Sequence, residues 1–432
     1  MFHKKTWKSL LIGLVTVSMV VVSFPPGVSA ERGAECYDVN RPVTPEEQRI
    51  DDGKPIPRQI LEDSRFDRFV EEFQQDLCRS SGPEAAKRLV EKTGVQLWKT
   101  AVDRAQGKRP DLGNLDRYDD RPLYWARLHM TRALRQWDPN FTVTEKQRSK
   151  LLMRLEYTSR GLTTVRFPKG KQIKRVMVSG FDPYRLEQEF RRSNPSGASV
   201  LQMDGQRIET KEGPAIIQSV MFPVRWRDFE DGIVEDAFGP YLKKGPNRID
   251  LMMTISQGRP QQMDIEGFAG RWHTGTDNEL AERSTEIPPV SHWPMPDSPL
   301  EFIETTLPYQ AMVEAETGPW PVLYNDEVCE WLPPDYVDPY VCHEGGPTPG
   351  SKARSGGGGS YLSNESQYRS NRLRIALGAD DIPGGHLHNA ALQNYPEDKN
   401  VYIDAKFREE RRATVDQTVA LVQAAARSLY EK

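Results

Sequence analysis

The chain has 432 residues, with 58 lysines and arginines against 62 aspartates and glutamates, and its formal net charge is −4 with neutral histidines. This mildly acidic balance, without a basic stripe interleaved with aromatic residues, argues against a nucleic-acid partner. A chain of this length predicts two domains.

Residues 1–30 have the pattern of a secretory signal peptide. Three lysines precede an apolar stretch from Leu10 to Val22, and a Val-Ser-Ala sequence places the expected cleavage after Ala30. The stretch is short for a transmembrane span, and a retained membrane anchor is the alternative. We therefore expect a secreted, extracellular protein with no membrane attachment after signal cleavage.

The four cysteines are expected to form two disulfides, because an even number in an exported chain favours pairing over free thiols. Proximity in the sequence predicts the pairs Cys36–Cys78 and Cys329–Cys342. A zinc site would need further ligands, and the sequence offers only His343 beside Cys342, with no Cys-x-x-Cys.

Residues 31–165 are predicted to form an all-helical N-terminal domain. Apolar residues recur at helical spacing, which favours helices packed as a small bundle. The segments are Ile60 to Cys78, Pro83 to Ala105 and Pro122 to Trp137.

Residues 172–432 are predicted to form an α/β domain. Short apolar runs typical of buried strands alternate with helical stretches, which favours a mostly parallel sheet. The expected strands are Arg175 to Ser179, Ala215 to Pro223 and Arg248 to Ser256, and the expected crossover helix is Arg227 to Lys243. The predicted fold is a three-layer α/β/α domain with a mostly parallel, mixed central sheet behind the helical domain.

Residues 326–359 are predicted to be an inserted loop rich in proline and glycine. The segment follows a short expected strand at Pro321 to Tyr324 and contains the second predicted disulfide. Such a loop could cover or reshape a neighbouring site.

Seven short motifs follow one another along the α/β half. They are Gly180-Phe181-Asp182-Pro183-Tyr184, Asn194-Pro195-Ser196, Ser256-Gln257-Gly258, Asp264-Ile265-Glu266, Thr306-Leu307-Pro308, Ser360-Tyr361-Leu362-Ser363-Asn364 and Gly385-His386-Leu387-His388. In this order they resemble the signature of the pyroglutamyl peptidase I (pyrrolidone carboxyl peptidase) family. The resemblance covers about Lys174 to Lys432, apart from the insertion.

The resemblance implies a catalytic set of Glu266, Ser363 and His388, with Ser363 in place of the family's cysteine. His388 would take the hydroxyl proton and later deliver it to the leaving amine, while Glu266 would orient the imidazole and stabilise its charged form. Serine avoids the oxidation that threatens a thiolate in an exported protein, but loss of activity would explain the replacement equally well.

Each of these residues has a structural alternative. Ser363 precedes a helix expected from Asn364 to Leu377, where free amides could stabilise an oxyanion but where serine is also a common N-cap. His386 and His388 would share a strand face, as buried core or as two metal ligands that lack a third. Glu266 could be a solvated surface residue.

The same resemblance implies a substrate pocket. Phe181 and Tyr184 would wall an apolar slot for the five-membered lactam ring, with Gln257 nearby. Ordinary packing at a strand end is the alternative for either aromatic residue.

The predicted function is that of a secreted hydrolase that cleaves an N-terminal pyroglutamyl, or related, amide bond in a peptide or small amide. A catalytically silent protein that binds such peptide ends and an amidase or esterase with another substrate are the alternatives. No cofactor and no metal are expected, because Gly-x-Gly-x-x-Gly after a strand and paired metal histidines on a helix are missing. The Gly-x-Ser-x-Gly elbow of α/β-hydrolases is missing as well.

Overall fold

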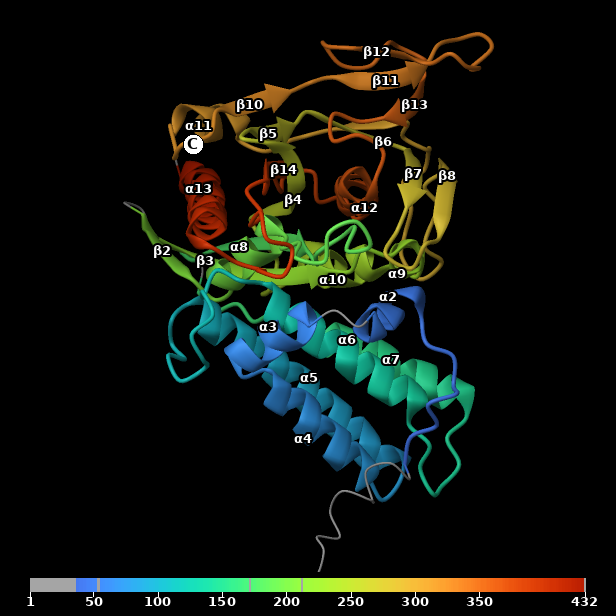
Figure 1. Ribbon diagram of the computed structural model, residues 1–432. Coiled ribbons are helices and arrows are strands. Elements are labelled where there is room, and N and C mark those ends of the chain that lie inside the picture. The colour runs from blue at the N-terminus through green and yellow to red at the C-terminus, as the bar shows by residue number, and fades with distance from the viewer. Residues whose placement is uncertain (1–35, 53–54, 171, 211–212, 431–432) are drawn as a thin grey trace, which may run out of the picture.

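The computed structural model describes residues 36–52, 55–170, 172–210 and 213–430, and it divides into a helical half and an α/β half (Figure 1). The predicted signal peptide lies outside the described residues. Within the described ranges, no helix is long and apolar enough to cross a membrane.

The helical half confirms the predicted helical segments with one change. Its helices are α2 (Pro45–Gln48), the 3-10 turn η1 (Arg49–Asp51), α3 (Ile56–Ser64), α4 (Asp67–Cys78), α5 (Pro83–Ala105), α6 (Arg121–Gln136) and α7 (Glu145–Ser159). The prediction of one continuous helix over Ile60 to Cys78 is wrong, because Arg65 takes a left-handed backbone with φ of 60° that ends α3 before α4 begins. The predicted disulfide between Cys36 and Cys78 is present.

A seven-stranded sheet in the order β10-β5-β14-β4-β1-β3-β2 forms the centre of the α/β half. Its strands are β1 (Lys174–Phe181), β2 (Arg207–Thr210), β3 (Gly213–Phe222), β4 (Leu251–Pro260), β5 (Met263–Glu266), β10 (Val322–Asn325) and β14 (Gly384–Ala391). All neighbours pair in parallel except β2 with β3 and β14 with β5. The mixed, mostly parallel sheet is the one predicted.

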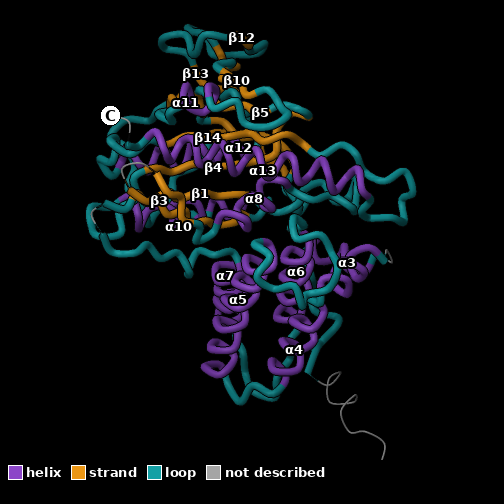
Figure 2. The backbone as a smooth tube through the Cα atoms, turned by 90° about the vertical axis from the view of Figure 1, so that its left-hand side faces the viewer, coloured by secondary structure: helices purple, strands orange, loops and turns teal. Residues whose placement is uncertain are grey.

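Helices cover both faces of this sheet, which makes the half three-layered (Figure 2). On one face α8 (Pro195–Met203) packs against α13 (Ala405–Ser428), and on the other α10 (Ile233–Leu242) packs against α12 (Leu362–Ala376). The predicted single crossover helix is in fact two, α9 (Trp226–Glu230) and α10, because Gly232 has a left-handed φ of 97° between them. The predicted fold class is confirmed.

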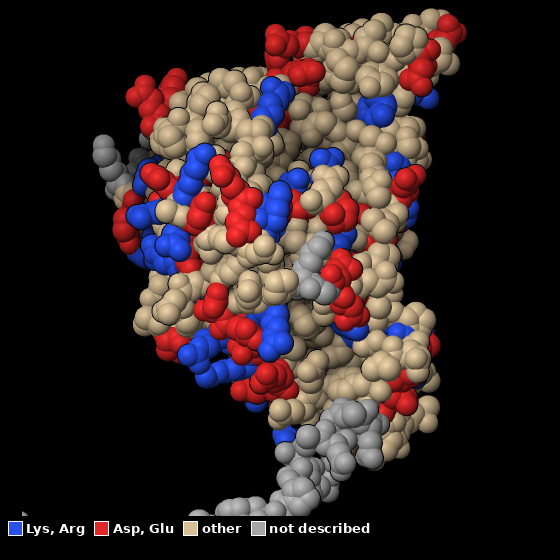
Figure 3. All heavy atoms as spheres, viewed as in Figure 1, with Lys and Arg blue, Asp and Glu red and all other residues tan. Residues whose placement is uncertain are grey.

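Shorter elements surround the sheet. They are α11 (Tyr309–Glu314), the antiparallel pair β6 (Phe268–Gly270) and β9 (Phe302–Glu304), and the antiparallel pair β7 (Trp272–Thr276) and β8 (Glu282–Glu286). On the face drawn in Figure 3, basic and acidic side chains are interspersed without a stripe of one sign.

Residues 326–359 form a small sheet where we predicted a loop. The strands β11 (Val328–Trp331), β12 (Val341–His343) and β13 (Lys352–Ser355) pair antiparallel in the order β12-β11-β13. Cys329 and Cys342 lie opposite each other on β11 and β12 and form the predicted disulfide. The strands escaped prediction because each has only three or four residues.

The two halves share one hydrophobic core. Leu97 and Trp98 of α5 belong to the same buried cluster as Val200 and Leu201 of α8. Because α8 lies directly on the central sheet, the helical half is continuous with the interior of the α/β half.

A buried carboxyl group also joins the halves. Asp120 precedes α6 and accepts hydrogen bonds from the Ser193 hydroxyl and, at 2.9 Å, from the backbone N–H of Asn194. Burial and the neighbouring Asp119 raise the pKa of Asp120 to about 7. The folded protein therefore keeps a proton that the unfolded chain releases near the ordinary aspartate pKa.

We expect this proton to make stability fall as pH rises from about 4 to about 7, by an amount on the order of 4 kcal/mol at full effect. An Asp120→Asn variant stays neutral and can still accept from Asn194. The difference between its melting temperature and that of the wild type should therefore shift in favour of the variant over this pH range and stay constant above it. Calorimetry of both proteins from pH 4 to pH 8 checks this. Melting temperatures that change with pH in the same way in both proteins would contradict this expectation.

Candidate active site

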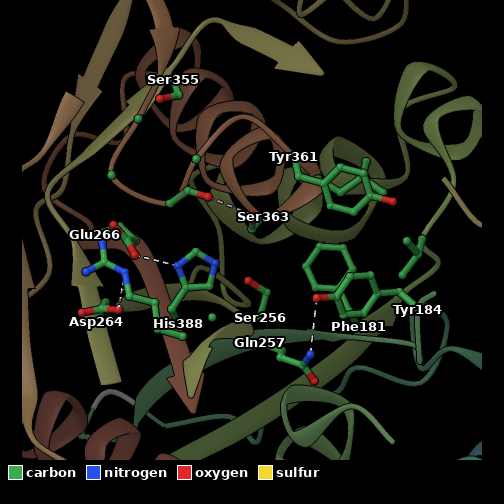
Figure 4. A pocket seen from close by; sticks show the side chains of 18 of the residues that line it. Phe181, Tyr184, Ser256, Gln257, Asp264, Glu266, Ser355, Tyr361, Ser363 and His388 are labelled. Carbon is green, nitrogen blue, oxygen red and sulfur yellow. Dashed lines mark hydrogen bonds and ion pairs between the residues drawn. The ribbon is translucent and has the colours of Figure 1, made fainter. Parts of the chain in front are cut away.

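A cavity of about 490 Å³ lies where β1 and β4 end, beside β5 and β14. The segment after β1, the small sheet of residues 326–359 and the start of α12 complete its wall. Its lining includes all six residues singled out in the sequence: Phe181, Tyr184, Gln257, Glu266, Ser363 and His388. In Figure 4, Glu266, Ser363 and His388 lie together on one side of the view, and Phe181, Tyr184 and Gln257 lie together on the other.

His388 and Glu266 form a buried pair. Because β14 runs antiparallel to β5 with His388 opposite Asp264, the two side chains project from the same face of the sheet. The Nδ1 atom of His388 lies 2.6 Å from Oε1 of Glu266, and the Glu266 side chain is 1% exposed. Since Glu266 occupies Nδ1, the Nε2 atom of His388 is the nitrogen left for the cavity. The alternative of a solvated Glu266 is wrong.

Asn325 holds the other oxygen of Glu266. Its Nδ2 donates to Oε2 of Glu266 and to the carbonyl of Gly357, both at 2.9 Å. These two acceptors fix the orientation of the amide and of the carboxylate. No sequence pattern predicts this contact, because Asn325 lies 59 positions from Glu266.

Ser363 is the second residue of α12 rather than its cap. Tyr361 occupies the N-cap position and makes no capping hydrogen bond, so the N-cap interpretation of Ser363 is wrong. The Ser363 hydroxyl donates to the carbonyl of Gly358 at 3.2 Å. Among the hydrogen bonds of the described residues, none joins Ser363 to His388.

His386 does not serve as a free ligand. Its Nδ1 lies 2.7 Å from the Thr254 hydroxyl and its Nε2 lies 2.8 Å from the Ser256 hydroxyl, while burial, followed by the influence of His388, lowers its pKa well below the usual value. The rings of His386 and His388 are 4.6 Å apart, as expected for one strand face. With both nitrogens of His386 occupied, the paired-histidine metal site is not supported.

Four consecutive glycines, residues 356–359, cover the His388–Glu266 pair. A Cβ atom on Gly358 would lie 2.9 Å from Cε1 of His388, and one on Gly357 would lie 2.4 Å from Oε2 of Glu266. The absence of side chains therefore allows the backbone to approach both residues closely. The glycine run is evident in the sequence, but the sequence does not show that the run lies over His388 and Glu266.

A Gly358→Ala substitution should displace the His388 ring and lower any catalytic efficiency by about 10²-fold, since a misplacement of about 1 Å is enough for such a loss. The effect is steric, because Gly358 is not among the residues with positive φ. Gly82→Ala is the matched control, since nothing lies within 4 Å of its added Cβ. Steady-state kinetics of both variants test this, and equal rates would contradict it.

The predicted substrate wall combines core packing with cavity lining. Phe181 is buried and stacks on Phe229 with ring centroids 6.0 Å apart, so the packing alternative holds for most of its surface. Tyr184 is half-buried, and its hydroxyl accepts from Nε2 of Gln257 at 3.4 Å. Tyr361 faces Tyr184 at 6.4 Å between ring centroids and is an aromatic lining residue to which the sequence assigned no role.

Two solved structures of pyroglutamyl peptidase I from Bacillus amyloliquefaciens are similar to this chain at 20% sequence identity each. One covers 59% of this chain and 97% of its own, with a TM-score of 0.37. The other covers 58% and 96%, with a TM-score of 0.36.

Two family models match the sequence. The PA0049 N-terminal domain matches residues 28–156, and the PA0049 C-terminal domain matches residues 175–279 and 327–393. Uncharacterized protein PA0049 of Pseudomonas aeruginosa is 31% identical over 480 aligned residues, which cover 88% of this chain and 86% of that protein. The chain therefore belongs to the PA0049 family.

Proposed function

We propose that this protein is an exported hydrolase that cleaves the amide bond after an N-terminal pyroglutamyl residue through an acyl-serine intermediate. The observation that carries the proposal is the buried Glu266–His388 pair, 2.6 Å long, which faces the same cavity as the Ser363 hydroxyl. This is the base and orienting carboxylate that a serine nucleophile requires. The order of the sequence motifs, which resembles the signature of the pyroglutamyl peptidase I family, supports a pyroglutamyl substrate.

In the proposed reaction, the Ser363 hydroxyl turns from the Gly358 carbonyl toward Nε2 of His388. His388 takes the proton as the oxygen attacks the substrate carbonyl, and Glu266 stabilises the resulting imidazolium. The C–N bond then breaks as His388 gives the proton to the leaving amine. Water, activated by His388, releases the acyl group and restores the serine.

The start of α12 is suited to the oxyanion of this reaction. The helix begins at Leu362, so the first amides of the turn that carries Ser363 have no acceptor within the helix. Their N–H groups and the positive end of the helix dipole favour a developing negative charge. The lactam ring would lie between Phe181 and Tyr184, with Gln257 offering its amide.

Export from the cytoplasm is part of the proposal. The two disulfides are those of a protein from an oxidising compartment. A serine nucleophile suits such a compartment better than a thiolate does.

One observation favours a second candidate function, that of a silent binder of pyroglutamyl peptide ends. The Ser363 hydroxyl donates its hydrogen bond to the carbonyl of Gly358 and not to His388. Release of a fluorophore from a pyroglutamyl amide, measured beside calorimetric titration with a pyroglutamyl peptide, separates the two. Turnover supports the hydrolase, heat without turnover supports the binder, and neither signal contradicts both.

A further inference from the structure

The segment of residues 182–194, between β1 and α8, forms one wall of the cavity without a helix or strand of its own. Tyr184, Arg185 and Asn194 from this segment line the cavity, beside Phe181 at the end of β1. A wall of irregular backbone needs support from elsewhere to hold one geometry.

That support comes from the helical half through Asp182. Arg127 of α6 donates through Nη1 to both carboxylate oxygens, at 2.9 and 3.0 Å, and Arg160 donates to Oδ2 at 2.6 Å. All three side chains are 2% exposed. A carboxylate adjacent to the cavity wall is therefore held by two cations from the other half of the molecule.

The arginines are themselves fixed. Nε of Arg127 donates to the Ser159 hydroxyl at 3.1 Å, and Nε of Arg160 donates to Glu156 at 2.6 Å. Both partners belong to α7, so the geometry of the helical bundle sets the position of Asp182.

The backbone around Asp182 is held in the same way. Asn278 donates through Nδ2 to the Pro183 carbonyl at 3.0 Å and to Glu46 of α2 at 2.9 Å. At the far end of the segment, Nη1 of Arg121 donates to the Arg191 carbonyl at 2.8 Å. The helical half thus contacts both ends of the wall.

We propose that the helical half is a working part of the substrate site, and that Arg127, Arg160 and Asp182 are positioning residues for Phe181 and Tyr184. Their role is in substrate affinity, because they touch the wall that receives the ring and not the Glu266–His388 pair. The effect on substrate affinity rests on the proposed hydrolase function, whereas the support of the wall by the ion pairs does not depend on that function.

Trypsin gives a readout of the wall that needs no activity. Arg185 is exposed and lies in the irregular segment, so cleavage after it reports how often the segment opens. We expect Arg127→Met and Asp182→Asn to speed the appearance of the new terminus at Leu186 by about tenfold or more. The first removes one of the two cations that hold Asp182, and the second leaves the buried Arg127 without its carboxylate partner.

The control is Arg132→Met, on the same helix. Its partner is Asp51, at 2.6 Å, within the helical half. All variants are compared at the same interval below their own melting temperatures, so that global destabilisation does not count as local opening. An Arg127→Lys variant, which keeps the charge and loses the two-oxygen contact, should fall between Arg127→Met and the wild type. Cleavage at Arg185 no faster in Arg127→Met than in the control would overturn the proposal.

The kinetic arm uses the fluorogenic pyroglutamyl amide. Arg127→Met should raise KM by about tenfold and change kcat by less, since the wall positions substrate without touching the reacting atoms. An unchanged KM beside faster cleavage would overturn the substrate role of the wall. Absence of turnover in the wild type would contradict the hydrolase proposal alone and would leave the trypsin comparison as the deciding test.

Discussion

Ser363→Ala should lower kcat/KM for a pyroglutamyl amide by about 10⁴-fold or more, because the residue supplies the atom that attacks the substrate. Its hydroxyl makes a single hydrogen bond of 3.2 Å to Gly358, so the fold should lose little stability with it. The melting temperature is therefore expected to stay within a few degrees of the wild type while turnover disappears.

Ser363→Cys separates the chemistry from the packing. A thiol fits the same position, and beside His388 it should be activated more readily than a hydroxyl, so turnover should persist in this variant. The rate at which a small electrophile such as iodoacetamide alkylates the thiol of the Ser363→Cys variant would give a second measure of its activation. Full activity in Ser363→Ala would exclude Ser363 as the nucleophile, whatever the cysteine variant does.

Glu266→Gln should lower kcat by about 10⁴-fold, through the histidine and not through the fold. Asn325 donates to Oε2 of Glu266 and would keep the oxygen of the new amide on its own side. The NH2 group would then face Nδ1 of His388 and force the imidazole proton onto Nε2. With Nε2 protonated, His388 cannot accept the proton of Ser363.

The chain contains a matched control for this prediction. His273 and Glu365 form a second buried pair, also 2.6 Å from Nδ1 to a carboxylate oxygen, and neither residue lines the cavity. Arg369 holds the other oxygen of Glu365 at 2.6 Å. Glu365→Gln should therefore lower the melting temperature and leave kcat within about tenfold. Steady-state rates and melting curves of both variants decide the matter, and equal losses of kcat would refute a special role for Glu266.

Regular elements were predictable because periodicity and length determine them. The predicted α5 coincides with Pro83–Ala105, and the predicted strands overlap β1, β3 and β4. The interruption at Arg65 was not predictable, since the apolar spacing continues across it and only the left-handed backbone reveals the break. At Gly232 the Asp-Gly pair is a turn signal, but the apolar spacing on both sides favoured one continuous helix.

The predicted site residues line one cavity, their roles stay a prediction, and the contacts among them were not predictable. The order of the motifs pointed to Glu266, Ser363 and His388 as one set, and these three residues line one cavity. The contact of Asn325 with Glu266 and the cover of glycines over His388 depend on register between distant strands, which local sequence does not encode. The same limit applies to Asp182, whose two arginines come from the other half of the chain.

The core shared by α5 and α8 bears on how such a protein can evolve. A fragment that began at β1 would expose the apolar surface of Val200 and Leu201 to water and would leave Asp182 without both of its arginine partners. The two halves are therefore expected to be inherited together, and exchange of either half between relatives should succeed only when the opposing surface is exchanged with it.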